Sequence, residues 1–495
     1  MPLTLRRSLL ACGFAAGLAA VPARAATTPQ QAQALADQLQ AWLVGTLGAD
    51  FPPPPHALQV TPQDDGYAVA WPLGLLPGVA TEAGSEVSAT VRPLDRGRWS
   101  IDAIRLPNPM TLTVTAPAGG KASGPVHVTW QVAGQQAEGV LDPSLASPSS
   151  LTFRLTGTDL TVDGPRVSQR SHFDAMTVQA GLVPAAVGRA DVTEEASGEN
   201  YSSTQRDQHG EVQLAARSIH ASGHLTGLDL ARAEAALHAG LHVVSEALAL
   251  RGTDVHERRD AVLRPAVVAF LRSLRDLTSG GELSETLEAL RVVSGEHRVA
   301  VDRLGVGTGW KARDGLLSAQ VSLVADGVRS PEIPGEFRAY VPRHVLVRPM
   351  VAGVSLTAVD DLLNGAAAPA ADRPGRLAAA LAALFAAGPP SVGIDALEID
   401  LGPAKVRGAG VLVADAPDDL RGQAEVTATG FDALLDQIRA DPKLASALPV
   451  LATIRLLARP EGDRLIWDIT FRHGDLLING TDITALLGLR HHHHE

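Results

Sequence analysis

Two histidines and two glutamates near the middle of the chain have the spacing of metal ligands. Glu234, His238, His242 and Glu246 recur every four residues in an amphipathic segment, so a helix would place them along one face. Two histidines one helical turn apart could bind zinc together with a carboxylate. The same spacing is typical of a solvated helix face on which Glu and His side chains pair. No HExxH motif occurs, so we predict no metal site and keep His238, His242 and Glu246 as weak candidates.

A second group of possible metal ligands closes the chain. His491 to His494 and Glu495 would bind nickel or zinc only loosely, because no surrounding structure would fix the imidazole rings. We therefore expect 489–495 to be a flexible tail without a functional metal site.

A glycine-rich segment begins like a nucleotide-binding loop. Gly305, Gly307 and Gly309 are followed by Trp310 where a third loop glycine would stand, and the next segment alternates like a strand. Phosphate binding needs a helix N-terminus directly after the loop. We predict a glycine-rich bend or bulge here, and no cofactor.

Acidic residues could serve a hydrolase only if the fold brought them together. They occur at Asp64-Asp65, Glu194-Glu195, Asp360-Asp361 and Asp418-Asp419, and Asp395, Glu398 and Asp400 flank a predicted strand. Surface turns and helix starts account for such pairs. No GxSxG or SxxK motif occurs, so we predict no catalytic residues and treat a hydrolase as the weakest hypothesis.

Charge and composition exclude one class of partner. The chain has 54 acidic and 42 basic residues and a net charge of -12, with no basic stripe. Nucleic-acid binding depends on clustered basic residues that neutralise phosphates, so we exclude it. An anionic membrane surface is excluded as an electrostatic partner for the same reason.

The first residues predict export. Arg6 and Arg7, an apolar run from Leu9 to Val21 and a small-x-small site ending at Ala25 make a signal peptide, 1–25, and a periplasmic location. The paired arginines fit both general and twin-arginine export, and Cys12 leaves a lipoprotein open. Cleavage would remove Cys12, the only cysteine, and with it disulfides, thiolate ligands and a cysteine nucleophile. No later apolar run approaches about 18 residues, so we expect a soluble mature chain without a transmembrane anchor.

The elements that would position functional residues alternate along most of the chain. Leu35, Leu39, Trp42 and Leu43 have helical spacing, which predicts a helix over 29–48. Segments of period two then follow up to about residue 225, which predicts antiparallel strands joined by short turns. Helical patterns cover 229–250, 263–277 and 283–293, and strands resume from 297. A Pro/Ala linker and an alanine-rich helix follow at 364–388.

A weak internal repeat lies in the second half. Residues 353–363, ending Ala-Val-Asp-Asp-Leu-Leu, line up with 425–435, ending Gly-Phe-Asp-Ala-Leu-Leu, and both predict a strand that leads into a short helix. A third copy would be the strand 476–478, the turn Asn479-Gly480, Asp482 as N-cap and a helix face of Ile483, Leu486 and Leu487. Chance similarity of small and apolar residues explains the same alignment.

These segments carry a family resemblance. The leader, the early helix, the alternating strands, "AVDDLL", "GQAEVTATGFDALLDQI" and "ITFRHGDLLING" resemble an uncharacterised alphaproteobacterial envelope family defined as a domain of unknown function. Its layout is similar to that of AsmA-like envelope proteins. The resemblance implies curved sheets with an apolar interior and lipid handling at the envelope, and it supplies no catalytic residues. The predicted lack of an anchor departs from AsmA proteins and argues against bridging two membranes.

Together these features predict an α+β, β-rich fold of long curved antiparallel sheets with packed amphipathic helices. We predict a β-rich domain at 26–225, a central helical segment at 226–295 and a β-rich domain with strand-helix units at 296–488. The predicted function is non-enzymatic: binding of a lipid or other hydrophobic ligand, with a scaffold subunit contacting envelope proteins as the alternative. An apolar concavity lined by Trp71, Trp99, Trp130 and Trp467 would favour ligand binding, whereas filled cores would favour a scaffold.

Overall fold

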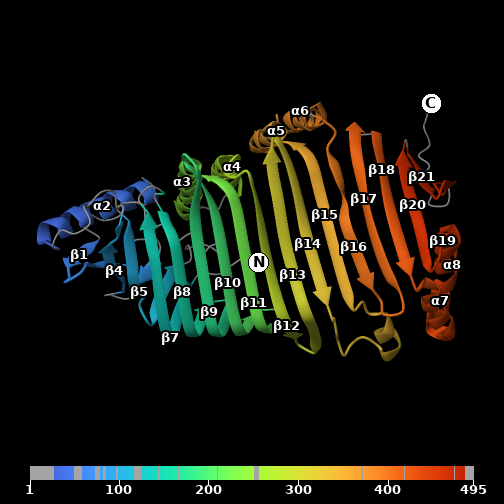
Figure 1. Ribbon diagram of the computed structural model, residues 1–495, viewed down its shortest axis with the longest axis horizontal. Helices are drawn as coiled ribbons and strands as arrows, with labels where there is room; N and C mark the ends of the chain where they lie inside the picture. The colour runs from blue at the N-terminus through green and yellow to red at the C-terminus, as the bar shows by residue number, and fades with distance from the viewer. Residues whose placement is uncertain are drawn as a thin grey trace. The chain divides into compact units, whose positions relative to one another are not determined.

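The chain is β-rich, and its strands pair antiparallel as expected (Figure 1). The computed structural model describes residues 27–48, 58–72, 79–81, 85–95, 98–115, 124–142, 145, 147–165, 167–208, 210–249, 256–368, 372–386, 388–416, 419–472 and 474–484. The predicted signal peptide 1–25 and tail 489–495 lie outside these residues. Two compact units are present: unit 1 is Met1–Gly281 with Val293–Gly295, and unit 2 is Glu282–Val292 with Glu296–Glu495.

Among its described residues, unit 1 contains a helix near the start, a run of strands and two further helices after them. In chain order these are α2 (Pro29–Leu47), β1 (Gln59–Pro62), β2 (Tyr67–Pro72), β3 (Val79–Thr81), β4 (Glu86–Pro93), β5 (Trp99–Arg105), β6 (Met110–Thr115), β7 (Pro125–Asp142), β8 (Ser147–Asp163), β9 (Val167–Ala186), β10 (Arg189–Asp207), β11 (Gly210–Asp229), α3 (Leu230–Ala249) and α4 (His256–Ser273). The sheet runs β1-β2-β4-β5-β7-β8-β9-β10-β11, and β3 and β6 join along the other half of β7. Most strands therefore pair with their neighbours in sequence.

Helix α2 packs on this sheet as its spacing predicts. It begins with a capping box, in which Thr28 Oγ1 accepts from Gln31 N at 3.2 Å and Thr28 N donates to Gln31 Oε1 at 3.3 Å. Leu35, Leu39 and Leu43 are 1–3% exposed and form one core cluster with residues of the following strands. The predicted amphipathic helix is confirmed.

A row of residues interrupts the hydrogen-bonded ladder across β7 to β11. Between β8 and β9 the ladder passes from the pair Thr156–Ala175 to the pair Thr158–Phe173 and leaves out the position between them. The same position is left out in the pairings of β7, β10 and β11. We call it the crease row, and its members are Ala133 (β7), Gly157 (β8), Asp174 (β9), Asn200 (β10) and Arg217 (β11).

Side-chain alternation inverts at the crease row. Gly157 and Asn200 have φ values of 53° and 50°, in the left-handed region that Gly and Asn tolerate best. On β8, Leu155 and Thr158 are both buried although they stand three residues apart. A strand that keeps one face buried across such a position must turn over there, so the crease row divides the sheet into two zones.

Unit 2 contains further antiparallel strands and, among its described residues, two helical pairs. Its elements are β12 (Gly280–Ser294), β13 (His297–Arg313), β14 (Leu316–Asp326), η3 (Gly335–Tyr340), β15 (His344–Ser355), α5 (Leu356–Ala367), α6 (Arg373–Ala386), β16 (Ser391–Asp400), β17 (Lys405–Ala416), β18 (Asp419–Thr429), α7 (Phe431–Ala440), η4 (Pro442–Ala447), α8 (Leu448–Leu457), β19 (Arg459–Glu461), β20 (Arg464–Arg472), β21 (Asp475–Ile478) and β22 (Thr481–Asp482). The sheet runs β13-β14-β15-β16-β17-β18-β20-β21-β22, and β19 pairs with β20. Figure 1 shows α5 and α6 at one end of these strands, and α7 and α8 beside β20.

Several predicted elements take another form. Residues 283–293 form strand β12, not a helix, and β12 lies beside β13, where positions 305 and 307 approach Thr286 and Leu283. Sheet pairing overrides the helical spacing of the leucines there. The glycine-rich segment is also no bend or bulge, because β13 pairs with β14 from Arg303 to Arg313 without a register shift.

Two of the three predicted strand-helix units are present in the structure. Strands β15 and β18 lead into α5 and α7, which confirms the strand-to-helix pattern of 353–363 and 425–435. In the third copy the turn at Asn479 is followed by β22, and Leu486 and Leu487 lie outside the described residues. The predicted central segment 226–295 spans the end of β11, helices α3 and α4, and β12; both helices belong to unit 1.

Candidate hydrophobic binding face

Unit 2 presents one sheet face made almost wholly of aliphatic residues. Residues opposite one another in antiparallel strands share a face, so the strand register identifies its members. We call it the apolar face, and it consists of Leu304, Val306, Thr308, Trp310 and Ala312 (β13); Leu317, Ala319, Val321, Leu323 and Ala325 (β14); Val345, Val347, Pro349 and Val351 (β15); Val392, Ile394, Leu397 and Ile399 (β16); Val406, Gly408, Gly410, Leu412 and Ala414 (β17); and Leu420, Gly422, Ala424, Val426 and Ala428 (β18). Only Thr308 and Trp310 bring side-chain hydrogen-bonding groups to it.

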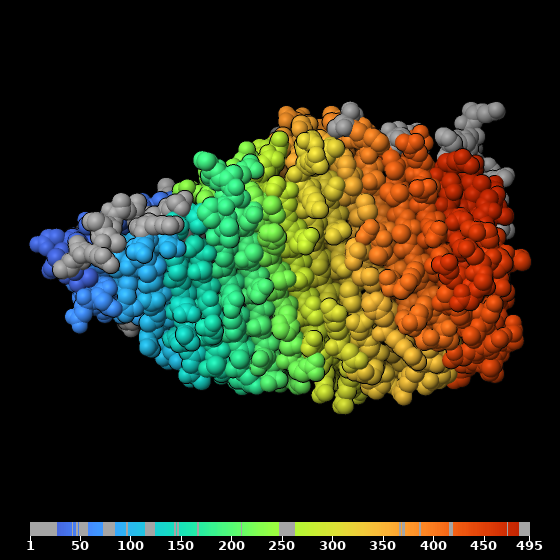
Figure 2. Space-filling view, viewed as in Figure 1, coloured from blue at the N-terminus to red at the C-terminus, as the bar shows by residue number. Residues whose placement is uncertain are grey.

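Much of the apolar face is open to solvent. Its exposed large side chains are Val321 (38%), Leu323 (46%), Val392 (57%), Ile394 (38%), Leu412 (40%) and Leu420 (39%). Figure 2 shows one side of strands β13 to β17, in yellow and orange, with α5 and α6 at the end of the strands rather than across them. A contiguous exposed apolar patch on this scale marks an interaction or ligand-binding surface.

The opposite face of the same strands carries charged residues together with aliphatic ones such as Leu346 and Val411. Ion pairs link adjacent strands there: His344 with Asp326, Arg348 Nη1 with Asp395 Oδ2 at 3.1 Å, Lys405 Nζ with Asp400 Oδ2 at 3.0 Å, and Arg407 Nε with Glu398 Oε2 at 3.7 Å. The backbone amide of Gly402, and then Lys405, hold the pKa of Asp400 below its usual value. The acidic residues singled out in β16 thus lie in cross-strand ion pairs, on the face opposite to the apolar face.

Helices α7 and α8 cover the continuation of the apolar face on β18 and β20. Ala428, Leu465 and Trp467 are only 1–6% exposed, because α7 and α8 pack over them. The ring centroids of Phe431 and Trp467 lie 5.9 Å apart, and Trp467 Nε1 donates to Ile454 O at 2.8 Å. The same kind of sheet surface is therefore a filled core under α7 and α8 and an open face over β14 to β17.

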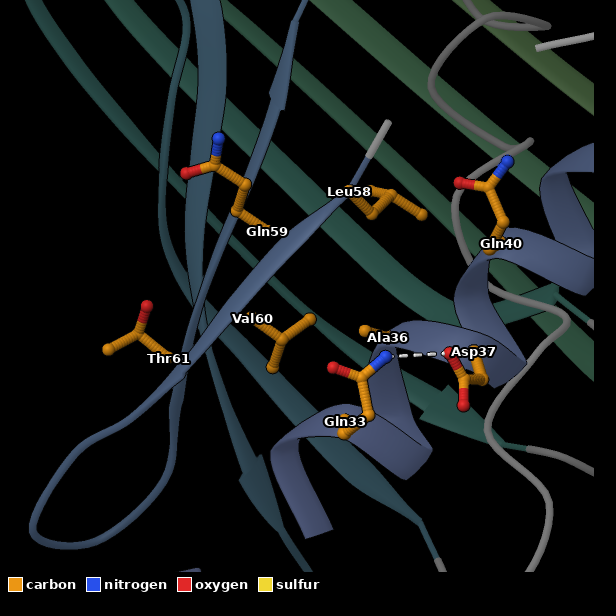
Figure 3. A pocket seen from close by; sticks show the side chains of 8 residues that line it. All are labelled: Gln33, Ala36, Asp37, Gln40, Leu58, Gln59, Val60 and Thr61. Carbon is orange, nitrogen blue, oxygen red and sulfur yellow. Dashed lines mark hydrogen bonds between the residues drawn. The ribbon is translucent and has the colours of Figure 1, made fainter. Parts of the chain in front are cut away.

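A shallow pocket beside α2 is the alternative site. It has a volume of about 330 Å³ and lies between α2 and β1, with Leu58 just before the strand (Figure 3). Gln33 Nε2 donates to Asp37 Oδ1 at 2.8 Å, while Val60 points toward the helix and Thr61 away from it. Gln33 and Asp37 are exposed surface residues that already bond to one another, so this pocket gives little to hold a ligand.

The candidate metal ligands lie on α3, as predicted. His238 Nε2 bonds to the backbone carbonyl of Gly45 at 2.6 Å, which fixes the C-terminal turn of α2 against α3. His242 and Glu234 are exposed, and Glu246 is half-buried. Across the described ranges, no three His, Cys, Asp or Glu side chains form a group that could hold a metal ion. The helix face is thus used in part for interhelical contact.

The large aromatic residues do not line the apolar face, apart from Trp310. Trp99, Trp130 and Trp467 are 1–7% exposed and fill three separate cores, and Trp71 packs against the first of these. Filled cores are what the scaffold alternative predicts. The aliphatic positions of β13 to β18 were not among the predicted site residues, although their period-two alternation marks them.

Comparison with known proteins adds no relative: no protein-family model, no curated protein and no solved structure matches the chain. Within the part of the chain that the structure describes, no helix is both long enough and apolar enough to cross a membrane.

Proposed function

We propose that unit 2 binds the acyl chains of a lipid on the apolar face. The observation that carries this proposal is the exposure of six large aliphatic side chains on a face with two hydrogen-bonding side chains. Each Å² of apolar area that a ligand removes from water contributes about 25 cal/mol. A ligand bound here gains free energy mainly through contact with hydrocarbon.

Acyl chains suit the apolar face better than an extended peptide does. Strands β14 to β18 already pair on both sides, so a peptide cannot join them as a further strand. A peptide laid on the face would find almost no partners for its backbone groups, and burying such groups unpaired is costly. An acyl chain has no such groups, and the grooves between side chains of neighbouring strands, about 4.8 Å apart, match its width.

The cellular setting of the proposal is the bacterial envelope. The signal-peptide pattern at 1–25 supports export to the periplasm, and the resemblance to AsmA-like proteins supports lipid handling there. The proposed role is non-enzymatic envelope maintenance.

Trp310 provides a direct test. A dibrominated stearic acid quenches an indole only when its bromines come close to the ring, and Trp310 lies on the apolar face. Trp99, Trp130 and Trp467 are buried in cores and serve as internal references. We expect saturable quenching that Trp310→Phe abolishes, and lipid in mass spectra of protein purified from its native host. A purified chain that carries no lipid and shows no quenching would refute the proposal.

A second candidate is docking of an envelope protein on α8. Val450, Ile454 and Leu456 of this helix are 63%, 39% and 83% exposed, although α8 packs on the sheet by its other side. Exposed aliphatic residues on a short helix suit a protein partner. Photo-crosslinkers at Val450 and Leu456 should then recover one dominant partner in cells, and a diffuse set of products would argue against it.

A further inference from the structure

His172 of β9 has a carboxylate on each of its ring nitrogens. Nδ1 lies 2.7 Å from Asp159 Oδ1 of β8, and Nε2 lies 3.0 Å from Asp174 Oδ1, which belongs to the crease row. Asn200 of β10, also in the crease row, donates from Nδ2 to Asp174 Oδ2 at 2.7 Å. A continuous chain of side-chain bonds therefore ties β8, β9 and β10 together where the backbone ladder is interrupted.

The bonding pattern requires a protonated imidazole. Ionised carboxylates only accept hydrogen bonds, and a neutral imidazole has a single N–H. His172 can donate to Asp159 and Asp174 at once only as the imidazolium. Loss of its proton leaves one carboxylate facing a ring lone pair and removes the positive charge between two negative ones.

The pKa shifts agree with this geometry. Hydrogen bonds to Asp159 and then to Asp174 raise the pKa of His172, against a smaller effect of desolvation. Bonds from Asn200 and then His172 lower the pKa of Asp174. A raised His pKa contributes stability that is complete below the ordinary value and is lost as pH rises through the raised value. A lowered Asp pKa contributes stability that is lost only as pH falls through the lowered value, so the bonds hold between the two.

The two carboxylates that contact the imidazole are the groups that shift the pKa of His172. Besides Asp159 on β8 and Asp174 on β9, the charged residues that the register places around this site are Arg170, two residues away on β9, Glu199 on β10, beyond the crease row, and Arg217 on β11, in the crease row next to Asn200. The residue directly opposite His172 on β10 is the uncharged Ser202. Titration of this site is therefore governed by the two carboxylates that touch the ring.

We propose that His172 is a proton-operated latch on the crease row: its imidazolium joins β8 to β10 across the interrupted ladder, and deprotonation releases the crease. The crease row is the line of this sheet at which ladder pairs are left out, and the side-chain bonds from Asp159 through His172 and Asp174 to Asn200 cross it. This device lies in unit 1 and does not depend on lipid binding by unit 2.

Hydrogen exchange of the full chain tests the latch. Amide exchange is measured from pH 5.5 to 9 and corrected for intrinsic rates, with β17 and β18 as the internal reference. We expect amides of β8 to β10 near the crease row to exchange faster as pH rises, about tenfold for each unit of pKa shift. The ¹⁵N shifts of His172 should titrate at the same midpoint, above the ordinary histidine value.

Variants separate the latch from a general effect of pH. His172→Gln should give fast, pH-independent exchange at the crease row, and Asp159→Asn should lower the midpoint. His220→Gln is the matched control, because His220 is exposed on β11 opposite Ser197; it should behave like the native chain. Three results would each overturn the proposal. They are amide exchange at the crease row that does not depend on pH in the native chain, a titration midpoint of His172 at or below the ordinary histidine value, and a pH dependence of exchange in His172→Gln that equals that of the native chain.

Discussion

Placing two amides on the apolar face should weaken lipid binding strongly. Val392 and Leu412 stand opposite one another on β16 and β17 and are 57% and 40% exposed. Fully burying such a side chain contributes about 1.5–3 kcal/mol, so covering the exposed parts contributes about 1 kcal/mol each. The double variant Val392→Asn, Leu412→Asn loses about 2 kcal/mol of this, and each amide adds a desolvation cost of about 1–3 kcal/mol. The affinity for an acyl chain should therefore fall by at least about thirtyfold.

The control for this variant changes the other face of the same strand. Val411 pairs with Gly393 and Val413 with Ser391, which places both side chains opposite to the apolar face. Val411→Asn, Val413→Asn costs the same strand propensity without touching the proposed site. Dibrominated stearic acid is titrated against Trp310 fluorescence in both double variants, after thermal melts show that each is folded. Equal affinity in the two variants, or native affinity in the first, would refute the assignment of the site.

Three further predictions concern the stability of each unit. Thr28→Ala removes one half of the capping box of α2 and should lower the free energy of unfolding of unit 1 by about 1 kcal/mol. Leu35→Ala truncates a side chain that is 1% exposed and should lower the same free energy by about 2–5 kcal/mol. Both are read from denaturant melts that follow unit 1, and a larger loss for Thr28→Ala than for Leu35→Ala would contradict the packing described. Asn479→Ala should destabilise unit 2 by about 3 kcal/mol, because Asn479 Nδ2 donates to Leu457 O and Ile466 O at 2.8 and 2.9 Å and its Oδ1 accepts from Asp468 N at 2.9 Å. A melt of unit 2 unchanged by this variant would contradict that role.

Elements whose apolar side chains all meet one partner could be predicted from the sequence. In α2, the leucine spacing and the Thr28–Gln31 capping pair agree, and the structure has the helix at that place. In β12, Leu283, Leu287 and Leu290 also have helical spacing, yet the segment is a strand. Local spacing fails there because pairing beside β13 supplies hydrogen bonds that the spacing does not encode.

The candidate site could be predicted only in part, for a similar reason. Alternation in β13 to β18 shows that one face is apolar, and the register makes that face continuous. Whether a face is covered depends on where helices dock, and the repeat in the sequence treats α5 and α7 alike. In the structure Phe431 and Leu435 of α7 are 8% exposed, whereas Val359 and Leu363 at the matching positions of α5 are only half-buried. The extent to which each helix is buried could not be predicted from the sequence, since helices of similar amphipathicity can dock to different extents.

The neighbour-to-neighbour strand order of both units bears on how the chain acquires its structure. From β7 to β11, and again from β13 to β18, each strand pairs with the one made just before it. Contacts between segments close in sequence form fastest, because little chain entropy is lost in bringing them together. A chain delivered residue by residue, from a ribosome or through a translocation pore, can thus add each new hairpin to an edge that already exists. Such a meander is suited to assembly in the order of delivery, without waiting for its C-terminus.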